Sequence, residues 1–291
     1  MTGARSFSVV GAGRLGTSLA AALARRGWKP LLIVDPDARA ARACRLAAGA
    51  VRATRALRAG DRPGGTVFVA VPDGELARVA AGLARSGVPW AGRAVFHTSG
   101  LLPARLLAPL AAKGAVTAAL HPAQSFPRPD APASAFKGIT WGIEGEPAGV
   151  EAATAVVRAL GGRALLLAEK DKALYHAACV LASNAVAALQ GAAAGLLAAV
   201  GLGEEEASGL LLPLAQRTLQ NVKDLGPEKA LTGPVARGDA AAVRKHLEAL
   251  RAHPAAREAY LALGRRSLEL AERRGLARGR VRSLRRLLGG G

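Results

Sequence analysis

The sequence predicts an α/β domain with a mostly parallel sheet, followed by a domain built only of helices. Short apolar runs typical of strands alternate with helical segments up to residue 168, and after that point the strand pattern stops. A glycine-rich turn also joins the first strand to the first helix. We therefore divide the chain into an α/β domain, residues 1–168, and a helical domain, residues 169–291.

The glycine-rich turn carries the G-x-G-x-x-G spacing at Gly11, Gly13 and Gly16. The first glycine permits a tight turn, the second lets backbone approach a pyrophosphate, and the third lets the helix pack on the strand. The N–H groups that begin a helix also attract phosphate. This turn, together with its Arg14 and Leu15, therefore predicts a Rossmann domain that binds a dinucleotide. An ordinary strand–turn–helix unit is the alternative.

Asp35 ends the second expected strand, where a carboxylate would accept hydrogen bonds from the ribose hydroxyls of the dinucleotide. The same carboxylate would repel the 2′-phosphate of NADP and therefore favours NAD. Arg14, Arg39 and Arg42 are close enough in the sequence to accommodate that phosphate. The residues thus predict NAD or NADP as the cofactor and leave the choice between them open.

The other elements of the α/β domain follow the same alternation. Strands are expected at residues 5–10, 31–35, 66–71, 94–97, 115–120, 138–144 and 163–168, and helices at 14–26, 38–48, 74–86, 103–112 and 148–160. Ligands of such sheets bind at the carboxyl ends of the strands. We therefore expect the chemistry in the turns that follow the strands, with Val71 and Pro72 beside the nicotinamide and a proline-rich loop, residues 124–136, over the site.

Ser99 and His121 each follow one of these strands and are the first candidates for catalysis. A histidine can hold or donate the proton that accompanies hydride transfer to a carbonyl. The Ser99 hydroxyl would bind the substrate oxygen or the amide of the cofactor, so we place it in both the catalytic and the cofactor-binding sets. The alternatives are a serine that caps the following helix and a strand-end histidine that bonds to backbone.

A long helix, expected over residues 170–200, is apolar on nearly every face. Such a helix is buried in a core or between subunits, which favours a homodimer formed through the helical domain. Its few polar groups need partners. We expect Lys172 to polarise a carbonyl and Asn184 to orient a carboxylate or a water molecule. His176 and Ser183 are expected to contact substrate. The alternative is a solvated lysine and hydrogen bonds within a core.

Arg237 lies in the segment Leu231-Thr-Gly-Pro-Val-Ala-Arg-Gly-Asp239, which interrupts the helical half. Its guanidinium suits a substrate carboxylate, which it can hold by two parallel hydrogen bonds. An ordinary surface arginine is the alternative. In the same segment, the Gly-Pro pair should end one helix and Asp239 should cap the next.

Composition narrows the function classes. The formal charge is +19, yet the basic residues are scattered except at residues 273–286, and no nucleic-acid-binding motif accompanies them, so we expect no nucleic-acid partner. Cys44 and Cys179 are too few for a disulfide framework, and we expect no metal site. The sequence has no signal-peptide pattern and no unbroken run of about 18 apolar residues, which predicts a cytoplasmic protein without a membrane span.

Five segments together resemble a known family. They are the glycine turn, His97-Thr-Ser-Gly100, His121-Pro-Ala-Gln-Ser-Phe-Pro127, Leu174-Tyr-His-Ala-Ala-Cys-Val-Leu-Ala-Ser-Asn184 and the segment with Arg237. With them, nearly the whole chain resembles Rossmann-like proteins that carry a helical C-terminal domain of unknown function. That family is similar to 6-phosphogluconate, 3-hydroxyacid, ketopantoate, pyrroline-carboxylate and prephenate dehydrogenases and reductases. The resemblance implies NAD(P) binding and a helical half, of the 6-phosphogluconate dehydrogenase-like type, that dimerises.

The resemblance also implies roles for individual residues. Ser99 and His121 are similar to the serine and histidine of prephenate dehydrogenases that contact the reacting hydroxyl. The helix with Lys172 and Asn184 is similar to the hydroxyacid dehydrogenase helix that bears a catalytic lysine and asparagine. Those families place the two residues about one turn apart, whereas here they are twelve positions apart. This departure favours His121 for handling the proton.

Taken together, the residues and the resemblance predict an NAD(P)-dependent oxidoreductase for a small carboxylate-bearing oxo or hydroxy compound. A ketopantoate-type 2-oxo acid is the first choice of substrate, and pyrroline-carboxylate- or prephenate-type chemistry is the alternative within the enzyme class. A catalytically silent nucleotide-binding sensor or scaffold is the alternative outside it.

Overall fold

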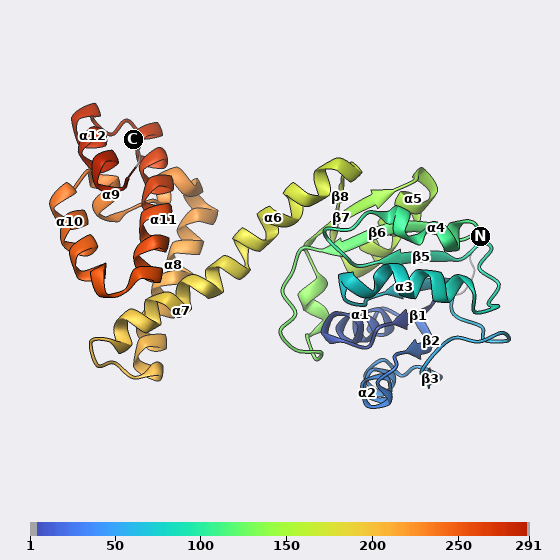
Figure 1. The fold of residues 1–291 in the computed structure, drawn as a ribbon. Helices are drawn as coiled ribbons and strands as arrows, with labels where there is room; N and C mark the ends of the chain where they lie inside the picture. Colours follow the sequence, from blue (N-terminus) through green and yellow to red (C-terminus); the bar gives the residue numbers. More distant parts are fainter. Residues whose placement is uncertain (1–4, 290–291) are drawn as a thin grey trace. The chain divides into compact units, whose positions relative to one another are not determined.

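An eight-stranded sheet forms the centre of the first structural unit, Met1–Val180, in the order β3-β2-β1-β4-β5-β6-β7-β8 (Figure 1). The structure, a computed structural model, describes residues 5–289. The strands are β1 Ser6–Val10, β2 Lys29–Val34, β3 Arg52–Thr54, β4 Thr66–Val69, β5 Ala94–His97, β6 Val116–Pro122, β7 Thr140–Gly145 and β8 Arg163–Leu166. All neighbouring strands in this sheet pair in parallel except β6 and β7, as the alternation in the sequence predicts.

Helices cover both faces of the sheet (Figure 1). One face is covered by α1 Arg14–Arg25, α2 Ala38–Ala48 and α5 Pro147–Leu160, and the other by α3 Asp73–Ala84 and the short turns η1 Ala104–Leu107 and α4 Ala108–Ala111. The 3₁₀ turn η2 Ala133–Phe136 lies in the proline-rich loop, and η3 Glu169–Asp171 precedes α6 Lys172–Ala182. The two-layer cover explains why the strands read as continuous apolar runs rather than as alternating patterns.

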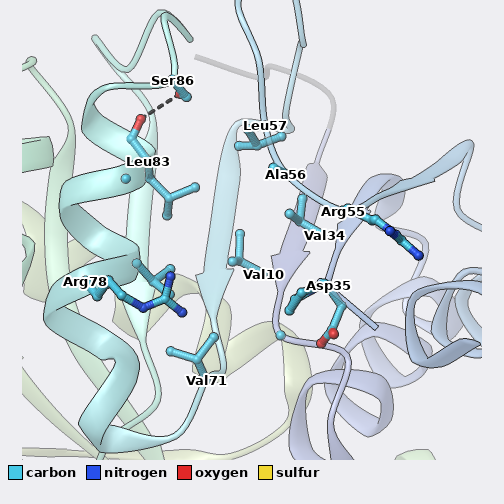
Figure 2. A pocket seen from close by; sticks show the side chains of 14 residues that line it. Val10, Val34, Asp35, Arg55, Ala56, Leu57, Val71, Arg78, Leu83 and Ser86 are labelled. Carbon is cyan, nitrogen blue, oxygen red and sulfur yellow. Dashed lines mark hydrogen bonds between the residues drawn. The ribbon is translucent and has the colours of Figure 1, made fainter. Parts of the chain in front are cut away.

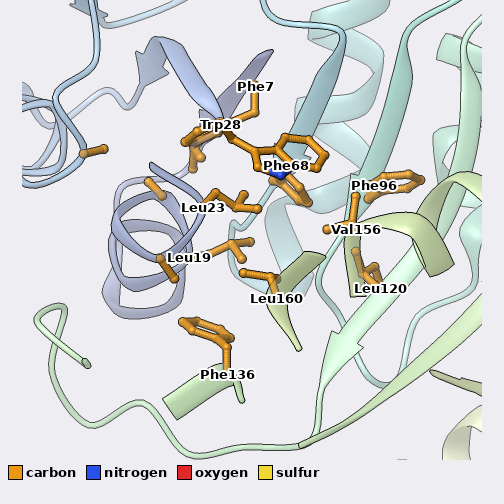
Figure 3. Packing of buried hydrophobic residues seen from close by; sticks show 14 of the residues in the cluster. Phe7, Leu19, Leu23, Trp28, Phe68, Phe96, Leu120, Phe136, Val156 and Leu160 are labelled. Carbon is orange, nitrogen blue, oxygen red and sulfur yellow. The ribbon is translucent and has the colours of Figure 1, made fainter. Parts of the chain in front are cut away.

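Strand periodicity divides the core into two clusters. On one face Phe7, Phe68 and Phe96 pack in a row across β1, β4 and β5, with ring centroids 6.3 and 6.0 Å apart (Figure 3). Val67 and Val95 point to the opposite cluster, because successive side chains of a strand face opposite sides of the sheet. Both faces are therefore packed up to the strand ends, which fixes the loops that follow them.

The second unit, Leu181–Gly291, has no strand among its residues 181–289. Its helices are α7 Asn184–Ala198, α8 Glu204–Ala230, α9 Gly233–Arg237, α10 Ala240–Ala249, the turn η4 Leu250–Ala252, α11 Pro254–Arg273 and α12 Arg278–Leu287. A small core around Val243, Leu268 and Leu284 packs α9, α10, α11 and α12 together. As predicted, Asp239 caps a helix, since its side chain accepts the Ala242 N–H at 3.0 Å. The predicted fold class, an α/β domain followed by helices, is confirmed.

Two features of the predicted elements need correction. The helix expected over residues 170–200 is broken at Ser183, whose φ of −122° and ψ of −69° are not helical. Its first half, α6, belongs with the sheet, and its second half, α7, begins the second unit. No residue of α7 is buried, although its composition predicts burial. The short strand β3 is absent from the prediction.

The predicted boundary at residue 168 falls where the sheet ends. The first structural unit runs further, to Val180, because residues of α6 contact β6 and β7. Met1 to Ala4 of the predicted first domain and the last two residues of the second lie outside the described residues.

By length and composition alone, the helical stretch Glu169–Ala198 could cross a membrane, with a mean hydropathy of 1.5 over its most apolar window. The prediction of no span rested on the lack of an unbroken apolar run. Core helices of soluble proteins can meet the same criterion, but they are mostly buried, whereas none of this window is buried. Near its start the stretch carries Lys172, which is paired with a carboxylate of the sheet.

Candidate functional site

The turn between β1 and α1 requires glycine at two positions for steric reasons. Gly11 has a φ of +99°, and a Cβ there would overlap the carbonyl oxygen of Ala70. A Cβ on Gly16 would overlap the carbonyl oxygen of Gly11. Gly13 differs, because a Cβ there would meet no atom within 4 Å. The fold does not need a glycine at this position, so the open space fits a ligand that approaches the backbone, as a pyrophosphate does.

Asp35, at the end of β2, is held against the glycine turn. Its Oδ2 accepts the Ala12 N–H at 2.7 Å, and its Oδ1 accepts the Asp37 N–H at 2.8 Å. A carboxylate offers about four lone-pair positions, so two remain for other donors. The arrangement therefore fixes the carboxylate and still suits the predicted role of accepting from ribose hydroxyls.

A pocket of about 280 Å³ opens beside this carboxylate (Figure 2). Its charged side chains are Asp35, Arg55 from the segment after β3, and Arg78 from α3. Arg78 also pairs with Glu75, with Nε 2.7 Å from Oε2. Apolar side chains form the rest of the lining, among them Val10, Val34, Leu57, Val71, Val79 and Leu83. An apolar slot with a few charged groups at its rim suits the base and ribose of a nucleotide.

A second group of side chains gathers at the carboxyl ends of β5 and β6, which are neighbouring parallel strands. The Tyr175 Oη lies 3.0 Å from the His121 Nδ1, and the rings of His121 and His176 are 5.8 Å apart. Both histidines press on Gly100, where a Cβ would come within 2.7 Å of His176 and 3.0 Å of His121. The predicted residues His121 and His176 are therefore brought together, with a tyrosine between the sheet and α6.

Burial is the main cause of unusual proton affinity in this group. Burial, together with the charges of His176 and Lys172, lowers the pKa of His121 to about 4. Burial and Lys172 likewise lower the pKa of His97 to about 4. The same desolvation raises the pKa of the Tyr175 hydroxyl. At neutral pH His97 and His121 are therefore uncharged, and the Tyr175 phenol keeps its proton.

The Ser99 hydroxyl is engaged by its neighbours. It donates to the Asp73 Oδ2 at 2.9 Å, and it accepts the N–H groups of Leu101 and Leu102 at 3.2 and 2.9 Å. The two bonds from backbone N–H groups are the capping bonds that the alternative interpretation expects. The bond to Asp73 joins the turn after β5 to the start of α3. The predicted contact of Ser99 with substrate or cofactor stays a prediction.

Lys172 is 1% exposed, and its Nζ lies 3.6 Å from the Glu144 Oε2. Glu144, in β7, also accepts the Ala104 N–H at 2.7 Å. Burial lowers the pKa of Lys172, and the charge of Glu144 opposes that shift. The alternative interpretation, a solvated lysine, is therefore wrong. Lys172 is buried and belongs to an ion pair inside the first unit. Whether it acts in catalysis stays a prediction.

Three predicted site residues lie in the second unit. Ser183 precedes α7 and Asn184 begins it, while Arg237 ends α9 and is exposed. The sequence predicted that Lys172 and Asn184 lie on one continuous helix. The break at Ser183 shows instead that they lie on two separate helices. The roles of these three residues stay predictions.

Two family models together cover most of the chain. A Rossmann-like domain matches residues 2–122, and a domain of unknown function, DUF2520, matches residues 139–267. The chain joins a Rossmann-like domain to a DUF2520 domain. This confirms the resemblance predicted from the motifs. The comparison with curated proteins finds no match.

Solved structures are similar to this chain over most of its length. The protein BF3122 from Bacteroides fragilis, provisionally described as an NADP oxidoreductase, is 26% identical with a TM-score of 0.74, covering 91% of this chain and 98% of that one. Protein TM1727 from Thermotoga maritima is 26% identical with a TM-score of 0.69, covering 92% and 99%. A reductive aminase from Aspergillus terreus in complex with NADPH, 22% identical over 97% of this chain and 98% of its own, has a TM-score of 0.62 and shares the fold.

Sequence reasoning on this Rossmann-like DUF2520 chain missed Tyr175, Glu144 and Asp73. Tyr175 is one of only two tyrosines and directly precedes His176, so its position on the same motif was the available signal. Glu144 was harder to find, because only the fold shows that this acid at the end of a strand points at a lysine. Asp73 follows Pro72 directly, which placed it in a turn already marked as a ligand site.

Proposed function

We propose that this chain is an NAD(P)-dependent oxidoreductase that acts on a small carboxylate-bearing oxo or hydroxy compound. The observation that carries the proposal is the pairing of His121 with Tyr175 at the carboxyl edge of a sheet whose first turn leaves Gly13 open to a ligand. Ligands of open α/β sheets bind at this edge. The similarity to BF3122, provisionally described as an NADP oxidoreductase, supports the same activity.

The first unit supplies the residues that would hold the dinucleotide. The backbone from Gly11 to Gly16, with Arg14 and Leu15, faces the pyrophosphate, and Asp35 accepts from the ribose. Val71 and Pro72 follow β4, which pairs with the strand that bears His97, so they would border the nicotinamide. When bound, the nicotinamide donates or accepts the hydride.

His121 is the residue we assign to the reacting oxygen of the substrate. Its ring is neutral at neutral pH, so it acts there as a hydrogen-bond donor or acceptor and not as a cation. Ser99 and His176 complete the polar wall around it, and we assign Lys172, whose charge acts on the His121 ring, to polarising the substrate carbonyl. The catalytic role of Asn184 and the substrate-binding roles of Ser183 and Arg237 stay predictions from the sequence.

We further propose a homodimer that forms through the helical half of a cytoplasmic protein. Large apolar side chains of α8 are exposed, which is typical of a surface that another protein chain covers; they include Leu210, Leu212, Leu214, Leu219 and Leu225. Sedimentation of the purified chain tests this part. A monomer at micromolar concentration would contradict it.

The activity is tested by following reduced nicotinamide in the presence of a panel of oxo compounds. The panel holds a ketopantoate-type 2-oxo acid, which we place first, and pyrroline carboxylate, with prephenate assayed in the oxidative direction. His121→Ala should abolish turnover while leaving nucleotide affinity within about twofold. His246→Ala, a histidine with the same kind of tyrosine partner in the second unit, is the matched control and should stay active. Nucleotide binding without turnover on any compound would favour a silent sensor instead.

A further inference from the structure

The contact between His121 and Tyr175 is a side-chain hydrogen bond whose direction depends on which nitrogen of the imidazole carries the proton. The Tyr175 Oη lies 3.0 Å from Nδ1 of the imidazole, within ordinary hydrogen-bond range. The two rings are 5.6 Å apart and nearly perpendicular, at 87°. One ring comes from β6 and the other from α6, so tertiary packing and not local chain geometry brings them together.

The chemistry of the two partners favours the tyrosine as the donor in this contact. A neutral imidazole has one nitrogen that donates and one that accepts, and a phenol in a buried position keeps its proton. Burial raises the pKa of Tyr175, and the Cys179 thiol beside it on α6 raises it as well. A thiol is a weak acceptor, whereas an imidazole nitrogen is a strong one. An arrangement in which Tyr175 donates to Nδ1 leaves the single ring proton of His121 on Nε2.

The Nε2 side of the ring remains available. Within residues 5–289 no side chain or backbone group forms a hydrogen bond with Nε2 of His121, and this atom is not among the fully buried polar atoms. The ring packs on Gly100, where any larger residue would collide with it. A donor N–H held in this way matches the need of a carbonyl oxygen that gains negative charge during reduction.

We propose that Tyr175 is a positioning residue that holds His121 in the tautomer with its proton on Nε2, so that a neutral N–H is presented to the substrate oxygen. This inference rests on the proposed oxidoreductase function. It assigns His121 the role of a neutral electrophile, which polarises the carbonyl by a hydrogen bond, as a buried neutral imidazole can. Tyr175 itself does not touch the substrate.

The second unit contains a matched control. His246 and Tyr260 repeat the contact, with Nδ1 and Oη 2.9 Å apart and the rings at 5.8 Å and 88°. This pair joins α10 to α11 and is exposed. Tyr260→Phe therefore removes the same hydrogen bond from the same chain at a position that we have not placed in the site.

The test is nitrogen NMR of the full chain labelled with ¹⁵N in histidine, at neutral pH. Wild type should show His121 with its proton on Nε2. Tyr175→Phe should yield a mixture of tautomers and lower kcat at least roughly tenfold, a fraction of what a positioned acid–base group contributes, with nucleotide Kd unchanged. Tyr260→Phe should change neither. His121→Ala identifies the resonances.

Two results would overturn the inference. One is a wild-type His121 with its proton on Nδ1, a reading that needs no activity. The other is a Tyr175→Phe protein whose His121 tautomer and kcat match wild type. If the chain turns over no compound at all, the oxidoreductase proposal fails while the tautomer reading still decides the role of Tyr175 toward His121.

Discussion

A single methyl group at Gly13 should weaken nucleotide binding without weakening the fold. Gly13 has a φ of −72° and a ψ of −166°, which any residue can adopt, and a Cβ there would meet no atom within 4 Å. We therefore expect Gly13→Ala to change the free energy of unfolding by less than about 0.5 kcal/mol, as surface substitutions do. The space that the methyl group fills is where we expect the pyrophosphate.

The size of the binding defect follows from the bonds that the methyl group displaces. A hydrogen bond between a backbone N–H and a charged phosphate oxygen contributes about 1.5–3 kcal/mol. Loss of one such bond at Gly13→Ala raises Kd roughly 10- to 150-fold. Isothermal titration with NADH and NADPH measures this change, and urea unfolding of the same preparation measures stability.

Gly16→Ala is the matched comparison, because its methyl group would overlap the Gly11 carbonyl oxygen. We expect this variant to lose about 1–3 kcal/mol of stability, the usual cost of forcing extra atoms into a packed site. The reasoning is refuted if Gly13→Ala binds both nucleotides as wild type does. It is equally refuted if Gly13→Ala is destabilised as much as Gly16→Ala.

Three further predictions concern stability. The pKa of His97 and of His121 is about 4 when folded and about 6.5 when unfolded, so the unfolded chain binds more protons between these values. Stability should therefore rise with pH from 4 to 6.5, by up to about 3 kcal/mol for His97, in urea unfolding curves; a flat profile contradicts this. Glu144→Gln should cost about 3–5 kcal/mol by leaving Lys172 buried without its counter-charge, and adding Lys172→Met should restore part of the loss. Phe136→Ala, which removes a fully buried ring stacked 5.7 Å from that of Trp141, should lower thermal stability by about 3–5 kcal/mol.

The sheet was predictable because its signals are local. The range of α2 agrees with the prediction to the residue, since Asp37 caps its first turn and Gly49 ends it with a positive φ. β3 was missed because three residues without an apolar run carry little pattern. The break at Ser183 was missed for a different reason: no glycine or proline marks it, so helix propensity alone predicts continuity.

The candidate site was predictable only in part. The glycine turn, His121 and His176 carry motifs that can be read along the chain, and the structure places the two histidines in contact. The partners of these residues could not be predicted, because they depend on tertiary packing. Tyr175 reaches His121 across 54 positions, and Glu144 reaches Lys172 only through the packing of α6 on β7.

The measurement that tests the central claim most directly is calorimetric titration of the full wild-type chain with NADH and with NADPH. The account predicts saturable binding of at least one of them, with one nucleotide per chain, and a defect in Gly13→Ala that Tyr260→Phe does not share. Absence of binding by both nucleotides at roughly 1 mM, the upper end of typical KM values, would contradict it.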